Sequence, residues 1–351
     1  MDKLLTVDKN YCMSHFLAFR FVEDENINFF ENLSHKVYKL EEKNEQDLIY
    51  SADDIERVIK QKINENYIPN KTAIFLSGGI DSAILASYLP KGTPAYTFKC
   101  IAPNAIDETK QAKKYCDAYD LEHRIVEIHW SDFEDLTPEI FEFDGVPFHS
   151  IEVQLLKAVR YAKKQGVEQL ILGDCADRIF GGHSKIYSKD WDFDEFVDFY
   201  MFVNPQLVLK KAIDVSSTFM PFKKKNGQFD TVRFVAEHRT LESRTSFMHI
   251  YEMENIKHLE PYSFMKLAEP LDIQRIRNGE PKYLLRELFA RRYPNIEIPN
   301  KIPMPRPMEQ WLKNYKVTRP EFIPNCTANL TGDQKWLVYC LEQFLNKYER
   351  R

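Results

Sequence analysis

The chain has 351 residues, 44 % of them hydrophobic, which is enough for one large or two modest domains with a substantial core. Its net charge of −5 argues against binding nucleic acid through bulk charge, so we expect no nucleic-acid partner. The sequence has neither a signal-peptide stretch nor an apolar run of membrane-helix length, and its six cysteines form no C-x-x-C pair. These features are typical of a cytoplasmic protein without membrane contact.

The first 50 residues are predicted to be a small β-rich unit that precedes one main domain over residues 51–351. Aromatic and β-branched runs at residues 14–22 and 36–40 predict two short strands there. Ser51 has the form of a helix N-cap, with the acidic Asp54 three residues on. Apolar residues at helical spacing then predict a helix up to residue 66.

From residue 72 the pattern alternates between strands and helices. Short apolar runs predict strands at residues 72–76, 95–99, 124–128 and 169–172. Helices are predicted at residues 82–89, 108–119, 132–143 and 151–165. This alternation predicts an α/β fold, a parallel sheet with helices on both faces. After about residue 185 the pattern is mostly helical, with loose stretches at residues 222–227 and 296–307.

The most informative motif is a glycine loop that follows the first predicted buried strand. Its functional positions are Ser77, Gly78, Gly79, Asp81 and Ser82. The paired glycines let the backbone approach an anion closely, while hydroxyl and N–H groups are donors to it. A carboxylate facing phosphate requires a cation between them, and Mg²⁺ prefers such oxygens. The loop is not a Walker A motif.

The S-G-G-x-D-S pattern resembles the pyrophosphate loop of the N-type ATP pyrophosphatases, which split ATP between the α and β phosphates. A second segment, residues 171–183, resembles the asparagine synthetase segment G-E-G-A-D-E-L-F-G-G-Y. The matching positions are Gly173, Ala176, Asp177, Phe180, Gly181 and Gly182. The resemblance implies a fold like the adenine nucleotide α-hydrolases (HUP-type) and the cofactors ATP and Mg²⁺. It also implies that Asp81 and Asp177 hold the metal, that Gly173 binds ATP, and that Asp174 takes a proton from the attacking nitrogen.

Two C-terminal stretches extend the resemblance to the asparagine synthetase family. Residues 282–289 are similar to the family's K-x-L-L-R-x-A-F helix, which adds Lys282 as a residue near the phosphates. The roles of Lys282 and Arg286 stay open between structure and phosphate neutralisation. The spacing from Lys301 to Pro307 and Trp311 agrees with the family, so its catalytic lysine falls on Lys301. A fixed ammonium there would stabilise the charge that develops during adenylation.

Several positions depart from asparagine synthetases, and these departures concern the nitrogen donor and the acid. Residue 2 is Asp2, so the N-terminal cysteine of a glutaminase domain is missing, and residues 1–50 are either a relic of that domain or a small cap. Asp174 replaces a glutamate, Cys175 a glycine and Arg178 an acidic residue. The segment from Arg244 lacks the family's D-R-M. We therefore expect an acid other than free aspartate.

These observations predict an ATP-dependent ligase related to asparagine synthetase B and β-lactam synthetase. It would adenylate a small-molecule carboxylate, transfer it to nitrogen, and release AMP and pyrophosphate. The nitrogen would come from free ammonia, from a separate glutaminase, or from an amine on the substrate itself. Two alternatives remain: a tRNA-modifying pyrophosphatase-loop enzyme, and a non-catalytic nucleotide-binding subunit.

Overall fold

A parallel five-stranded sheet forms the centre of the computed structural model, which describes residues 6–39, 46–300 and 304–349. The strand order is β6-β5-β4-β7-β8. The strands are β4 (Thr72–Phe75), β5 (Pro94–Cys100), β6 (Glu122–Ile128), β7 (Gln169–Ile171) and β8 (Lys257–Leu259). Because β4 pairs with β5 on one side and β7 on the other, the chain reverses its direction of winding between β4 and β7. Ligands of open α/β sheets bind at the carboxyl ends of the strands at such a point.

Helices cover both faces of this sheet, as the sequence predicts. Ala73 and Leu170 share one core with α6, whereas their neighbours Ile74 and Ile171 share another with α2, α3 and α12. Successive strand residues point to opposite faces, so this alternation means that both faces are buried. The first part of the chain supplies α2 (Ala52–Asn66), α3 (Ile80–Ala86), α4 (Thr109–Tyr119), α5 (Trp130–Asp144) and α6 (Ile151–Lys164).

The predicted boundaries of these helices hold closely. Ser51 caps α2, its hydroxyl accepting from the backbone N–H of Asp54, whose carboxylate accepts in return from the Ser51 N–H. This reciprocal arrangement satisfies two backbone donors that the first helical turn leaves open. The main shift is in α3, predicted from residue 82, which begins at Ile80, immediately after the glycine pair.

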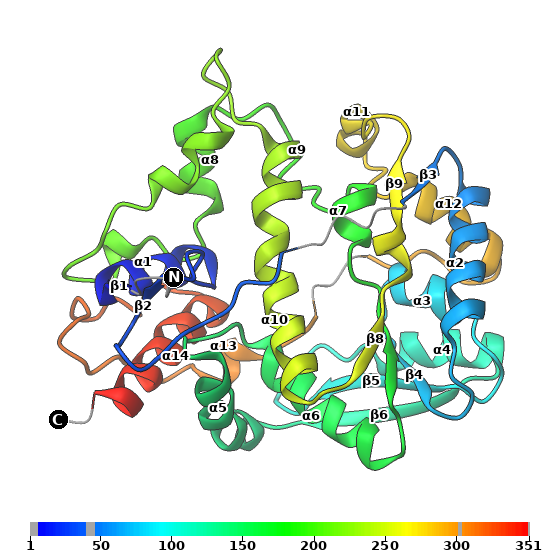
Figure 1. The fold of residues 1–351 in the computed structure, drawn as a ribbon, viewed down its shortest axis with the longest axis horizontal. Coiled ribbons are helices and arrows are strands. Elements are labelled where there is room, and N and C mark those ends of the chain that lie inside the picture. The colour runs from blue at the N-terminus through cyan, green and yellow to red at the C-terminus, as the bar shows by residue number, and fades with distance from the viewer. Residues whose placement is uncertain (1–5, 40–45, 301–303, 350–351) are drawn as a thin grey trace, which may run out of the picture.

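The remainder of the chain is mostly helical, but it also contributes strands. The helices are α7 (Ala176–Phe180), α8 (Phe193–Tyr200), α9 (Thr231–Phe234), α10 (Thr240–Met253), α11 (Ile273–Arg277), α12 (Tyr283–Arg292), α13 (Met308–Trp311) and α14 (Gly332–Tyr348). The prediction overlooked β8, the edge strand of the main sheet, and β9 (Met265–Leu267), which pairs with β3 (Asp47–Ile49). In Figure 1, α9 and α10 form a column through the middle of the molecule, between the sheet on the right and the region of α8 and α14 on the left.

The N-terminal segment differs from the prediction. The strand predicted at residues 14–22 is wrong, because α1 spans Lys9–Phe19, and residues 36–39 form no strand. Two-residue strands, β1 (Thr6–Val7) and β2 (Ile27–Asn28), pair beside α1. All residues from Cys12 to Phe19 are buried, so α1 shows no amphipathic period that would distinguish it from a strand.

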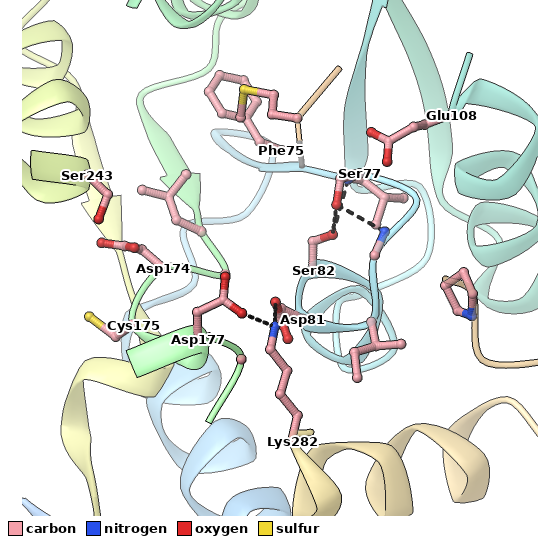
Figure 2. Close-up of a pocket in the computed structure, with 18 of the residues that line it drawn as sticks. Phe75, Ser77, Asp81, Ser82, Glu108, Asp174, Cys175, Asp177, Ser243 and Lys282 are labelled. Atoms are coloured by element: carbon pink, nitrogen blue, oxygen red, sulfur yellow. Dashed lines mark hydrogen bonds and ion pairs between the residues drawn. The ribbon is translucent and has the colours of Figure 1, made fainter. Parts of the chain in front are cut away.

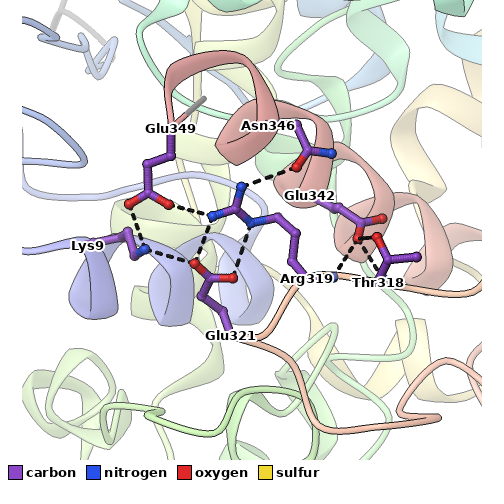
Figure 3. Close-up of polar contacts among 7 residues, drawn as sticks. All are labelled: Lys9, Thr318, Arg319, Glu321, Glu342, Asn346 and Glu349. Atoms are coloured by element: carbon purple, nitrogen blue, oxygen red, sulfur yellow. Dashed lines mark hydrogen bonds and ion pairs between the residues drawn. The ribbon is translucent and has the colours of Figure 1, made fainter. Parts of the chain in front are cut away.

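A polar network ties α1 to the C-terminal region (Figure 3). The Lys9 ammonium lies 3.0 Å from Glu321 and 2.8 Å from Glu349, and the Arg319 guanidinium contacts the same two carboxylates at 2.8 and 2.5 Å. Residues of α1 and α14 also share one hydrophobic core. The boundary at residue 50 stays a prediction, and α1 packs as part of the larger body. In the part of the chain that the structure describes, no helix has the length and apolar character needed to cross a lipid bilayer.

Candidate functional site

A pocket of about 590 Å³ opens at the carboxyl edge of the sheet, where the loops after β4 and β7 meet. This volume is in the range of small-molecule sites. Figure 2 shows side chains from both loops and from the start of α12 facing one space. The lining includes the predicted residues Ser77, Gly79, Asp81, Ser82, Gly173, Asp174, Asp177 and Lys282.

The loop after β4 is held in shape by its own serines. The Ser77 N–H donates to the Ser82 hydroxyl at 3.1 Å, and the Gly79 N–H donates to the Ser77 hydroxyl at 3.1 Å. Gly78 is not among the lining residues; its carbonyl accepts from the Tyr115 hydroxyl at 2.9 Å and faces α4. Ser77, Gly79 and Ser82 therefore present the loop to the pocket, and Gly78 anchors it from behind.

Lys282 lies between the two carboxylates that the sequence predicts as metal ligands (Figure 2). Its ammonium nitrogen is 2.5 Å from Asp81 Oδ2 and 2.5 Å from Asp177 Oδ1. Burial alone would lower the pKa of Lys282, but the carboxylates of Asp177 and Asp81 outweigh it and raise that pKa. The geometry therefore brings Asp81 and Asp177 close enough to share one cation.

Glycines permit the close approach of the two loops. A Cβ on Gly173 would lie 3.2 Å from the Ser82 backbone nitrogen and 3.3 Å from the Asp81 Cβ. A Cβ on Gly182 would overlap the Asp177 carboxylate and the Lys282 side chain. These two positions need glycine because other side chains fill the space, and both belong to the segment that resembles asparagine synthetases.

Asp174 forms the wall of the pocket next to Asp177. Burial first, and then the charge of Glu260, raise the pKa of Asp174 to about 6, against the lowering effects of Arg244 and Arg178. Its Oδ2 atom is buried and accepts no hydrogen bond from any residue in the described ranges. A carboxylate that titrates near neutrality and faces a pocket is suited to accept a proton.

Another part of the lining, which Figure 2 shows beside Asp174, comes from α10 and the residue before it. Ser243 and Phe247 line the pocket, together with Arg239. Arg244 does not line it, because its guanidinium pairs at 2.8 Å with the buried carboxylate of Glu260. The segment from Arg244 that departs from the family's D-R-M thus contributes the Phe247 ring to the pocket, and Ser243 just before it contributes a hydroxyl.

Sequence reasoning missed Glu108, which faces the glycine loop from the start of α4. Its side chain is buried, and burial raises the pKa of Glu108 to about 6. Its position just beyond β5, at the same sheet edge, was an available signal. Phe75 and Phe98, whose ring centroids are 5.3 Å apart, form an apolar part of the lining. Ser243, Phe247 and Arg239 gave no comparable signal, since no motif marks them.

Lys301, predicted as the catalytic lysine, lies outside the described residues. The flanking residues Asn300 and Met304 both line the pocket. Arg286, which the sequence left open between two roles, also lines it. The structure thus brings together the described residues of the predicted site except Gly78, which stands behind the loop.

Comparisons with known proteins agree with this description. Residues 70–268, more than half of the chain, match the family model described as asparagine synthase. Among solved structures, the NMN synthetase from Francisella tularensis is 14 % identical, with 72 % of this chain and 99 % of that chain covered and a TM-score of 0.29. The NH3-dependent NAD synthetase from Campylobacter jejuni is 12 % identical, with 72 % and 97 % covered and a TM-score of 0.26. No curated protein matches the chain.

Proposed function

Because the chain belongs to the asparagine synthase family, we propose that it is a ligase that adenylates a carboxylate and passes the acyl group to nitrogen. Family membership supports the general class, an ATP-dependent enzyme that forms carbon–nitrogen amide bonds. The observation that carries the finer proposal is the convergence of Asp81, Asp177 and Lys282 at the winding reversal between β4 and β7. Such a site concentrates charge where phosphate groups would bind.

ATP would bind with its phosphates at the loop formed by residues 77–82. The hydroxyls of Ser77 and Ser82 are the donors there, and the apolar pair Phe75 and Phe98 provides a surface for the adenine ring. Lys282 and Arg286 add positive charge at the same end of the pocket. We propose these roles from charge and shape, because an anion suits the hydroxyl donors and a flat apolar ring suits the aromatic side chains.

Mg²⁺ would be held by Asp81 and Asp177. The ammonium of Lys282 already stands between their carboxylates, which supports a cation in this position. Carboxylates together with phosphate oxygens are the usual Mg²⁺ ligands in nucleotide sites. The bound ion would neutralise charge on the leaving pyrophosphate, and Lys282, released from the carboxylates, would pair with phosphate.

The reaction would proceed in two steps. The substrate carboxylate attacks the α-phosphorus of ATP, and pyrophosphate leaves. The nitrogen nucleophile then attacks the acyl carbon, the bond to AMP breaks, and Asp174 accepts the proton that the nitrogen loses. Lys301 would stabilise the negative charge during both steps. The raised pKa of Asp174, about 6, supports the role of base near neutral pH.

Ammonia, free or from a separate glutaminase, and an amine on the substrate both suit the scheme. The acid would lie against Ser243, Phe247 and Arg239, and the departures at Asp174 and Arg178 support an acid other than free aspartate.

Isotope exchange between ATP and labelled pyrophosphate tests this proposal. The protein would be incubated with Mg²⁺, ATP, labelled pyrophosphate and a panel of carboxylic acids, without any amine. We expect label to enter ATP only with the correct acid, because adenylation is reversible. Binding of ATP without exchange for any acid, and without AMP in the complete reaction, would favour a non-catalytic nucleotide-binding subunit instead.

A further inference from the structure

Asp144, Glu152 and His249 form a buried cluster outside the pocket. Asp144 is the last residue of α5, Glu152 lies in the first turn of α6, and His249 is in α10. Their side chains are 0, 2 and 5 % exposed, respectively. Three helices that are separate in sequence therefore place two carboxyl groups and an imidazole together away from water, an arrangement that requires compensation of charge.

The distances within the cluster are those between ligands of one metal ion. His249 Nδ1 lies 3.2 Å from Asp144 Oδ2 and 3.7 Å from Glu152 Oε2, and one ligand atom of each residue lies within 4.8 Å of the others. A tetrahedral ion with bonds of about 2.0–2.2 Å separates its ligand atoms by roughly 3.3–3.6 Å. Little movement is needed to bring all three atoms to one centre.

The outer nitrogen of His249 fixes which ring atom faces the carboxyl groups. His249 Nε2 lies 3.1 Å from the carbonyl oxygen of Lys36, so Nε2 carries a hydrogen and donates it. Metal-binding histidines typically donate their second N–H to a carbonyl or carboxylate in this way. In the neutral ring, Nδ1 then presents its lone pair to two carboxyl groups, which requires a proton or a cation between them.

Among the described residues, no lysine or arginine supplies that cation, because none forms an ion pair with Asp144 or Glu152. Arg20, the residue after α1, pairs with Glu242 at 2.9 Å, and the Lys36 ammonium pairs with Glu252 at 2.7 Å. Asp144 Oδ1 is buried and accepts no hydrogen bond from the described residues.

We propose that Asp144, Glu152 and His249 bind one divalent transition-metal ion of the Zn²⁺ type. One imidazole and two carboxylates suit Zn²⁺ better than Mg²⁺ or Ca²⁺, which prefer oxygen ligands alone. With a neutral ring, the ion and the two carboxylates sum to zero charge. A small cavity of about 10 Å³ beside Glu152, Thr245 and His249 has about the size of one water molecule, which would complete the coordination.

The ion would have a structural function. It would join the ends of α5 and α6 to α10, the helix that also places Ser243 and Phe247 at the pocket. None of its three ligands lines the pocket. The site thus stands apart from the proposed chemistry and from its Mg²⁺, and the two proposals fail independently.

Metal analysis of the purified protein tests this site. The wild type would be dialysed with Zn²⁺, freed of loose ions, and measured by elemental analysis beside His249→Gln and Glu152→Gln. His123→Gln is the control for adventitious binding, since this half-buried histidine of β6 lies outside the cluster and its Nε2 is hydrogen-bonded to Thr97 Oγ1 at 3.0 Å. We expect about one ion per wild-type and control chain, and at least a tenfold weaker affinity in the other two variants.

Cobalt substitution makes the test independent of how the variants fold. Co²⁺ added to metal-free wild type is expected to give the visible absorption of a tetrahedral nitrogen–oxygen site at one equivalent, and Zn²⁺ is expected to displace it. A wild type that retains no Zn²⁺ and gives no such spectrum would overturn the proposal. Equal retention by folded His249→Gln would also overturn the proposal. The wild-type cluster would then be an imidazolium shared with two carboxyl groups.

Discussion

The Lys282 ammonium lies 2.5 Å from the carboxylate of Asp177, a residue that precedes it in the chain by more than a hundred positions. The same nitrogen is 2.5 Å from Asp81, so one buried cation links the loop after β4, the loop after β7 and the start of α12. Three segments that each resemble the asparagine synthetase family thus meet at a single charge. Any divalent ion that binds the two aspartates has to displace this ammonium.

Lys282→Met is expected to destabilise the protein in metal-free buffer and to make it responsive to Mg²⁺. Removing one partner of a buried ion pair costs about 3–5 kcal/mol, and the partly exposed carboxylates reduce this to about 1–3 kcal/mol here. Added Mg²⁺ is expected to restore part of the loss by taking the place of the ammonium. Thermal unfolding with and without Mg²⁺ measures both effects.

The matched control is Lys113→Met, which removes an exposed ammonium paired with Asp117 on α4. Its effect is expected to stay within about 0.5 kcal/mol, with no response to Mg²⁺. A Lys282→Met variant that unfolds like the wild type in both buffers would contradict the shared-cation interpretation.

Gly182→Ala is expected to abolish activity by displacing Asp177 and Lys282. The new methyl group would overlap both side chains, so they have to move from the positions in which they pair. We expect at least a hundredfold loss of AMP formation, from misplacement of groups that act on the phosphates. Gly166→Ala is the control: its φ of +85° makes the substitution cost about 1 kcal/mol, but no atom lies within 4 Å and activity is expected to remain. Full activity in Gly182→Ala would show that the pocket tolerates displacement of this pair.

Asp174 is expected to set the acidic limb of the pH–rate profile. Its pKa of about 6 means that the base is protonated below that pH, so kcat/KM is expected to fall about fivefold between pH 6 and pH 5. Asp174→Asn removes the limb together with most of the activity. Glu108 has a pKa of about 6 as well, so Glu108→Gln is the necessary comparison and is expected to retain the limb. A limb that disappears in Glu108→Gln would assign the base to Glu108.

The raised pKa of Asp174 also predicts the direction in which protein stability changes with pH. Its folded pKa of about 6 lies above the ordinary 3.8, so its contribution to stability is complete below about pH 3.8 and is lost as the pH rises through 6. Asp174→Asn is therefore expected to raise the melting temperature by about 2 °C at pH 8. At pH 4 the two proteins are expected to melt together. A lower melting temperature at pH 8 would mean that the ionised carboxylate is well compensated.

For Glu321, at the contact between α1 and the C-terminal region, we predict the opposite dependence of stability on pH. Burial raises the pKa of Glu321, but hydrogen bonds from Arg319 and Lys9 outweigh burial and lower it to about 2. The stability this provides is present above about pH 4.5 and is lost as the pH falls towards 2. Glu321→Gln is expected to lower the melting temperature at pH 7, and the difference from wild type is expected to shrink below pH 4.5. Glu127→Gln, on an exposed carboxylate, should show neither effect.

The sheet was predictable because its first four strands contain short apolar runs that alternate with helices along the chain. The N-terminal helix was not, since α1 is buried on every side and its residues lack a polar face that would reveal a helical period. β8 has three residues, Lys257, His258 and Leu259, and only pairing with β7 makes them a strand.

The candidate site followed from local motifs, while its distant members did not. Asp81 and Asp177 lie in the first turns of α3 and α7, within glycine-containing motifs that are visible along the chain. Arg239, Ser243 and Phe247 reach the pocket through packing of helices, which no spacing in the sequence specifies. The cluster of Asp144, Glu152 and His249 arises from three separate helices for the same reason.

The most direct test of the central claim is the identity of the nucleotide product. The protein would be incubated with Mg²⁺, α-labelled ATP, ammonium and the panel of acids, beside Asp81→Asn and Lys301→Ala, with Asp117→Asn as the surface control. The account predicts labelled AMP that depends on one acid, remains in the control and disappears in the other two variants. Labelled ADP in place of AMP would contradict cleavage between the α and β phosphates, and with it the proposed adenylation.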